Sequence, residues 1–194
     1  MARLLINHGL GNLRYPDHWQ RHLATAARKA GHVVAYPQFP SPEKPVTQDW
    51  QNLLVTEAAL LAEVGESAGE LLFVGHSLGS LNFLYAAQTG VLPVVFDRVL
   101  LVAPADPNLL PDLEIERLDP SKLDLSGVAK RVQILASDDD QWIPRGIQTT
   151  FGDPLGIEPV VIPGAKHLSL NDGWGYWQGV IDWVENPSAD LSKR

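Results

Sequence analysis

The amino-acid sequence predicts an α/β fold of three layers, α/β/α, in which about six parallel strands lie between helices. Three observations predict it: short apolar runs without strict alternation, amphipathic stretches between them, and a length of 194 residues. Non-alternating apolar runs are typical of strands covered on both faces, and strands that alternate with helices form parallel sheets. The predicted strands are residues 4–6, 33–36, 71–74, 99–102, 132–135 and 160–162.

Four stretches between the strands have helical spacing. The first, residues 16–30, opens with Pro16 and stops at Gly31, which is a typical start and stop pair. The second, residues 47–64, has Gly65 as its predicted stop. The other two are residues 77–88 and 174–184. By contrast, the proline-rich segment Pro104–Gly127 predicts a loop, which leaves room for a small cap at most.

Length and composition predict one domain and exclude several classes of function. We expect a single domain over residues 1–186 and a polar, frayed tail over 187–194. A net charge of −8 disfavours nucleic acid as a partner. Because no apolar run has the length of a signal-peptide core or a membrane span, we expect a cytoplasmic protein with no membrane partner. The absence of cysteine excludes disulfides and a cysteine nucleophile. No histidine spacing or glycine-rich loop predicts a metal or another cofactor.

The strongest motif is Gly75-His76-Ser77-Leu78-Gly79, directly after one predicted strand and directly before a predicted helix. This is the context of a nucleophile elbow, in which glycines permit a sharp turn and the serine projects from the end of the strand. The serine also lies at a helix N-terminus, where free N–H groups can stabilise an oxyanion. A glycine-bounded turn with a capping serine is the non-catalytic alternative.

A serine nucleophile needs a base, and the base needs an acid that orients it. After such an elbow the partners follow in the order acid, then histidine, each on a loop after a strand. His167 is the only histidine after Ser77, and it follows the last predicted strand. The acid belongs on the loop that contains Asp138, Asp139 and Asp140. The residues alone do not choose among the three, and the other two are expected to be solvated.

These motifs resemble the small serine hydrolases of the alpha/beta-hydrolase superfamily, in particular the retinoblastoma-binding-protein-nine family and its bacterial homologues. The resemblance covers most of the chain and implies the alpha/beta-hydrolase fold. It also implies that Asp140 is the acid, with Asp138 as the next candidate. The motifs that carry it are Gly75-His76-Ser77, Ser137-Asp138-Asp139-Asp140 closed by Ile143-Pro144, the glycine before His167, and Asp17-His18-Trp19. The sequence departs from the family's pattern at one place: family members often have glycine directly before the catalytic histidine, whereas here Lys166 separates Gly164-Ala165 from His167.

The loop after the first strand, Asn7-His8-Gly9-Leu10-Gly11-Asn12, is the expected source of a second oxyanion donor. By resemblance to the superfamily's His-Gly-x loops, the donors are the backbone N–H groups of Leu10 and Leu78. His8 is expected to have a supporting role only. The candidate residues of a substrate pocket are His8, Gly9, Trp19 and Trp142, and packing in the core is the alternative for the two indoles.

Together these features predict a serine hydrolase that cleaves carboxylic esters of small to medium acyl groups through Ser77, His167 and Asp140. Its expected partner is a small-molecule ester. Two alternatives remain open: a non-catalytic protein-interaction module on the same fold, and an acyltransferase or amidase that uses the same triad.

Overall fold

The computed structural model describes residues 1–64 and 69–194, so that Gly65, the predicted stop of the second helix, lies outside the described residues. Six strands form one parallel sheet in the order β2-β1-β3-β4-β5-β6. The fold is therefore the predicted three-layer α/β/α arrangement. The strands are β1 (Arg3–Asn7), β2 (Val33–Ala35), β3 (Leu71–His76), β4 (Arg98–Val102), β5 (Val132–Ser137) and β6 (Val160–Ile162).

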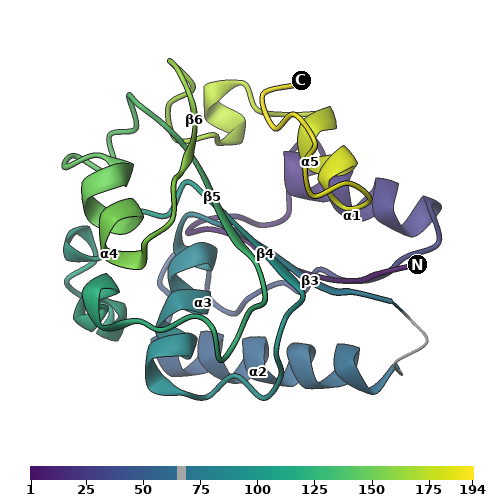
Figure 1. The fold of residues 1–194 in the computed structure, drawn as a ribbon, viewed down its shortest axis with the longest axis horizontal. Helices are drawn as coiled ribbons and strands as arrows, with labels where there is room; N and C mark the ends of the chain where they lie inside the picture. Colours follow the sequence, from purple (N-terminus) through teal and green to yellow (C-terminus); the bar gives the residue numbers. More distant parts are fainter. Residues whose placement is uncertain (65–68) are drawn as a thin grey trace.

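Helices cover both faces of this sheet. Figure 1 shows α1 and α5 on one side of it and α2 and α3 on the other. The helices are α1 (Trp19–Lys29), α2 (Thr47–Glu63), α3 (Leu78–Thr89), α4 (Asp153–Leu155) and α5 (Gln178–Trp183). Within the described part of the chain, no helix combines the length and apolar character needed to cross a membrane.

Alternate side chains of β1, β3, β4 and β5 pack into two separate cores, as the non-alternating apolar pattern predicts. On β1, Leu5 packs into the cluster that contains α2 and α3, whereas Leu4 and Ile6 pack into the cluster that contains α1 and α5. All three side chains have no exposed surface. Burial of a side chain of this size contributes about 1.5–3 kcal/mol, so β1 stabilises both layers of helices.

Two helix boundaries differ from the prediction by more than one residue. The first helix begins at Trp19 and not at Pro16, because His18 is its N-cap: its Nδ1 accepts the N–H of Gln20 at 3.2 Å. The last helix begins at Gln178, and a short 3₁₀ turn, Leu170–Asp172, precedes it. Short apolar patterns do not distinguish these turns from a continuous helix.

The segment Pro104–Gly127 is a packed connection between β4 and β5. It contains three 3₁₀ turns, Pro107–Leu109, Glu114–Arg117 and Pro120–Lys122. Ile115 and Leu118 are buried in the core beside α3. A π-helical turn, Gln148–Gly152, leads into α4 and was not predicted from the sequence.

The C-terminal tail is docked against α5, although we expected it to be frayed. Leu191 is buried, and its carbonyl oxygen accepts the indole N–H of Trp177 at 2.9 Å. The Arg194 guanidinium lies 4.0 Å from the centre of the Trp174 ring, which is close enough for a cation–π contact. A single apolar residue within a polar segment was too weak a signal to predict this docking.

Candidate active site

Ser77 lies in a sharp turn between β3 and α3. Its φ of 53° and ψ of −121° are uncommon for a residue with a side chain. The flanking glycines are required by close packing: a Cβ on Gly75 would lie 2.8 Å from the Ser80 nitrogen, and one on Gly79 would lie 2.7 Å from the His8 carbonyl oxygen. Larger residues would force α3 away from β1, so the motif has the local structure of a nucleophile elbow.

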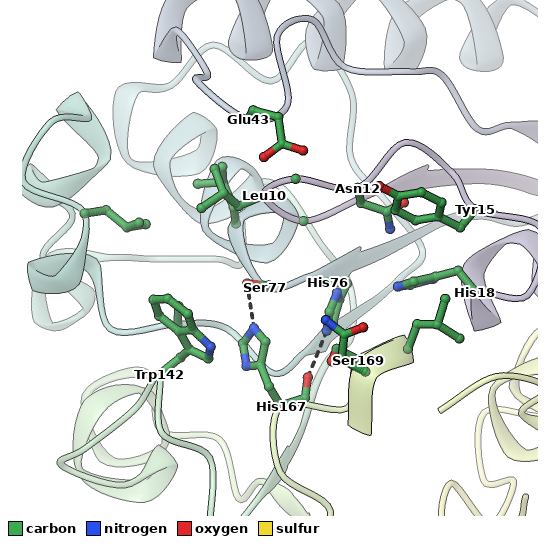
Figure 2. Close-up of a pocket in the computed structure, with 17 residues that line it drawn as sticks. Leu10, Asn12, Tyr15, His18, Glu43, His76, Ser77, Trp142, His167 and Ser169 are labelled. Carbon is green, nitrogen blue, oxygen red and sulfur yellow. Dashed lines mark hydrogen bonds between the residues drawn. The ribbon is translucent and has the colours of Figure 1, made fainter. Parts of the chain in front are cut away.

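The structure brings Ser77, His167 and Asp140 together in one chain of hydrogen bonds. The Ser77 hydroxyl lies 2.8 Å from His167 Nε2 (Figure 2). On the other side of the ring, His167 Nδ1 lies 2.7 Å from Asp140 Oδ2. The Asp140 side chain is fully buried. Its other oxygen, Oδ1, accepts the backbone N–H of Trp142 at 2.9 Å. In this arrangement Nδ1 of His167 carries the proton, and Nε2 is free to accept one from the serine.

The acid loop, residues 137–140, holds the loop that carries His167 by hydrogen bonds. Three successive backbone N–H groups of the histidine loop each donate to a different side chain of the acid loop. Asp138 Oδ1 accepts the N–H of Gly164 at 2.8 Å, and Ser137 Oγ accepts that of Ala165 at 2.8 Å. Asp139 Oδ1 accepts the N–H of Lys166 at 2.7 Å and the hydroxyl of Ser137 at 2.6 Å.

Both remaining aspartates are exposed to solvent, as expected. In addition, each accepts a backbone N–H from the histidine loop, which the sequence did not predict. The hydroxyl of Ser137 and the N–H of Lys166 hold the pKa of Asp139 below its usual value. Lys166 and Leu168, on either side of His167, both have positive φ angles, 55° and 53°. These hydrogen bonds hold the histidine loop in that unfavourable conformation.

The loop after β1 is anchored by His8. Its Nε2 accepts the backbone N–H of Phe39 at 2.8 Å, so that Nδ1 carries the hydrogen and donates to the Gly9 carbonyl at 2.9 Å. Leu10 follows in this loop and faces the pocket, while Leu78 opens α3, where N–H groups have no partner within the helix. Both Leu10 and Leu78 thus line the same pocket as Ser77.

A pocket of about 530 Å³ opens above Ser77. Of the four candidate pocket residues, Gly9 and Trp142 line it, whereas His8 and Trp19 do not. Trp19 is buried in the core, where its indole N–H donates to the Leu168 carbonyl at 3.0 Å. The other lining residues are Leu10, Gly11, Asn12, Tyr15, His18, Glu43, His76, Leu78, Ala105, Leu110, His167, Ser169, Leu170 and Asn171.

The family of the chain follows from its sequence together with this site. A family model described as serine hydrolase matches residues 4–186, which includes the elbow, the acid loop and the histidine loop. The chain belongs to this serine hydrolase family. No curated protein is a significant match to the sequence.

Solved structures similar to this serine hydrolase share its fold. The ydeN gene product of B. subtilis superposes with a TM-score of 0.76 at 21% identity, over 95% of this chain and 97% of the other. A protein described as a YdeN-like hydrolase from Pectobacterium atrosepticum gives 0.69 at 23% identity, over 95% and 89%. A structure from work on LipS and LipT, two metagenome-derived lipolytic enzymes, gives 0.60 at 18%, over 86% and 85%. These likenesses show the alpha/beta-hydrolase fold.

Two buried histidines of the serine hydrolase pocket, His18 and His76, were not predicted from the sequence to line it. The His76 Nε2–H donates to the His167 backbone carbonyl at 3.0 Å, so His76 also positions the histidine loop. Burial lowers the pKa of His18 to about 4 and that of His76 well below its usual value. Both imidazoles are therefore neutral at pH 7. Their motifs, Asp17-His18-Trp19 and Gly75-His76-Ser77, were noted, but motifs do not show where a ring points.

Acid should destabilise this serine hydrolase because several of its histidines are buried in the neutral form. Burial lowers the pKa values of His8 and His18 from 6.5 to about 4. Below pH 6.5 the unfolded chain binds protons that the folded chain excludes, so stability is lost as the pH falls from 6.5 towards 4. At pH 5 each histidine should cost on the order of 2 kcal/mol. Urea midpoints at pH 7 and pH 5 measure the loss, which His18→Asn should reduce. Equal midpoints for the wild type would contradict the prediction.

The exposed Asp139 should matter for catalysis through the histidine loop. Asp139→Ala removes the acceptor of the Lys166 N–H, and we expect kcat for p-nitrophenyl acetate to fall about tenfold because small displacements of a catalytic group are costly. Asp139→Asn keeps an Oδ1 acceptor and serves as the matched control, with a loss of about twofold at most. Steady-state kinetics and melting temperatures of both variants test this. Equal kcat values for the alanine variant and the wild type would refute the role of Asp139.

Proposed function

We propose that this serine hydrolase is a carboxylesterase for small to medium acyl groups, with Ser77 as nucleophile, His167 as base and Asp140 as the acid that orients it. The observation that carries the proposal is the 2.8 Å approach of the Ser77 hydroxyl to His167 Nε2 at the base of a pocket. A serine hydroxyl becomes an effective nucleophile only beside such a base. The lipolytic enzymes among the similar folds are consistent with ester substrates.

In the proposed reaction, Ser77 Oγ attacks the ester carbonyl carbon while His167 Nε2 takes the hydroxyl proton. The carbonyl oxygen becomes an oxyanion, which the Leu10 and Leu78 N–H groups stabilise. The ester C–O bond then breaks, and His167 returns the proton to the departing alcohol. A water molecule attacks the acyl-enzyme with His167 as base again, which releases the acid and restores Ser77. Asp140 stabilises the imidazolium in both steps.

The size and lining of the pocket support acyl groups of small to medium length. A pocket of about 530 Å³ lies within the usual range for small ligands. Figure 2 shows Leu10 and Trp142 beside Ser77 on one side. Ala105 and Leu110, from the segment 104–127, extend this apolar wall. Because that segment packs beside α3, it adds a wall without enclosing a long chain.

The test is hydrolysis of p-nitrophenyl esters from acetate to dodecanoate, with labelling by a fluorophosphonate probe. We expect labelling at Ser77 by mass spectrometry and the highest kcat/KM among the shorter esters. Absence of both labelling and hydrolysis would favour a non-catalytic interaction module. The same assays with p-nitroanilides, and with hydroxylamine as a competing nucleophile, identify amidase or acyltransferase activity. A preference for either reaction over ester hydrolysis would overturn the esterase proposal.

A further inference from the structure

His18 presents a hydrogen-bond donor to the pocket. Its Nδ1 accepts the N–H of Gln20 at the start of α1, so the hydrogen of this neutral imidazole is on Nε2. Only 5% of the residue is exposed, and the residue lines the pocket. In the described part of the chain, no hydrogen bond satisfies Nε2. Figure 2 shows the ring directed towards His76, on the opposite side of Ser77 from Trp142.

His76 has the opposite hydrogen-bonding capacity. Its Nε2–H is used by the His167 carbonyl, which leaves Nδ1 as an acceptor. Within residues 1–64 and 69–194, no hydrogen bond reaches this Nδ1. The His76 residue is 4% exposed and lines the same pocket. The centres of the His18 and His76 rings are 5.7 Å apart. A donor and an acceptor without protein partners in the described residues therefore lie side by side in the pocket lining, where a bound group can reach both.

We propose that His18 and His76 form a subsite for a free hydroxyl group of the substrate, which accepts from His18 Nε2–H and donates to His76 Nδ1. The substrate class is an ester with a hydroxyl group close to the scissile bond, because His76 directly precedes Ser77. This inference rests on the proposed esterase function. A hydroxyl is both donor and acceptor, so it satisfies both rings at once.

Other polar groups fit this pair of rings less well. A carboxylate can only accept hydrogen bonds, so it would leave His76 Nδ1, which is also an acceptor, without a donor. An ammonium group can only donate, so it would leave the His18 Nε2–H, which is also a donor, without an acceptor. Asn12, Tyr15 and Ser169, which lie around the two rings in Figure 2, are polar without a formal charge, and the pocket lining also contains the carboxylate of Glu43, above Leu10 and Asn12 in that view. These polar residues contrast with the apolar wall at Trp142 and Leu110. The pocket thus separates a hydroxylated part of the substrate from an apolar part.

The hydroxyl can belong to the acyl group or to the alcohol, and two pairs of substrates distinguish these sources. The acyl pair is p-nitrophenyl 3-hydroxybutanoate against p-nitrophenyl butanoate. The alcohol pair is glycerol monobutanoate against propyl butanoate. We expect the wild type to prefer the hydroxylated member of one pair by about tenfold in kcat/KM, which corresponds to one buried hydrogen-bond pair.

The variant that tests the subsite is His18→Asn. Asparagine is a good N-cap, so it keeps the acceptor for the Gln20 N–H but removes the Nε2–H. The measured quantity is the ratio of kcat/KM between the two members of a pair, and we expect it to fall to about 1 in this variant. His22→Asn, on the same helix but outside the pocket lining, is the matched control and should keep the wild-type ratio.

A wild type without preference in either pair would overturn the subsite, and so would a His18→Asn variant that keeps the preference. To separate this inference from the esterase proposal, calorimetry with Ser77→Ala protein compares methyl 3-hydroxybutanoate with methyl butanoate, and glycerol monobutanoate with propyl butanoate. Tighter binding of a hydroxylated ester supports the subsite even if the wild type hydrolyses no ester. Equal binding within both pairs refutes it even if hydrolysis is fast.

Discussion

Replacing Ser77 by alanine should lower kcat for p-nitrophenyl acetate by about 10⁵-fold and abolish fluorophosphonate labelling. The loss is this large because the nucleophile, its base and its acid act as a unit, and only binding and oxyanion stabilisation remain without the serine. The assay is steady-state hydrolysis at pH 8, with mass spectrometry of the labelled protein. Retention of either activity or label would exclude Ser77 as the nucleophile.

A matched control for this variant is Ser80→Ala. Ser80 lies one turn further along the same region, on α3, and its buried hydroxyl donates to the Val102 carbonyl at 3.2 Å. Loss of this bond should affect stability by about 1 kcal/mol and leave hydrolysis and labelling intact. Comparison of the two variants separates loss of the nucleophile from general disturbance of the elbow. Melting temperatures of both proteins show that each is folded.

Much of this site could be predicted because parallel strands end at one edge of the sheet. Ser77, Asp140 and His167 each follow a strand, so chain order alone placed them on neighbouring loops. The structure has these three side chains within hydrogen-bonding distance in the expected sequence of contacts. The choice of Asp140 over its two neighbours needed the family resemblance, because residue type does not tell which carboxylate points towards the histidine.

What could not be predicted depends on side-chain direction and on local turns. Trp19 was a candidate for the pocket, but it is the first residue of α1 and is buried in the core, while its neighbour His18 lines the pocket. The difference is one residue, and helix starts cannot be located that accurately from a pattern. The contacts of Asp138 and Asp139 with the histidine loop could likewise not be predicted from the sequence, because they join side chains to backbone groups 26 and 27 residues away.

Asp140→Asn should reduce kcat by about 10³–10⁴-fold, whereas Asp138→Asn should reduce it a few-fold at most. In Asp138→Asn, an amide oxygen can still accept the Gly164 N–H, so the histidine loop keeps its anchor. Steady-state kinetics of the two variants against p-nitrophenyl acetate make the comparison. A large loss in Asp138→Asn with a small one in Asp140→Asn would transfer the role of the acid to Asp138.

The large effect expected for Asp140→Asn follows from the two partners of this carboxylate. Oδ1 accepts the Trp142 N–H, so the oxygen of an asparagine is held at that position and its NH₂ group faces His167 Nδ1. Because that NH₂ can only donate, His167 Nδ1 must become the acceptor and the ring proton moves to Nε2. Nε2 then donates towards Ser77 Oγ and cannot take its proton. The fold would remain intact while His167 is held in the wrong tautomer. A normal melting temperature together with the large loss of kcat would show this.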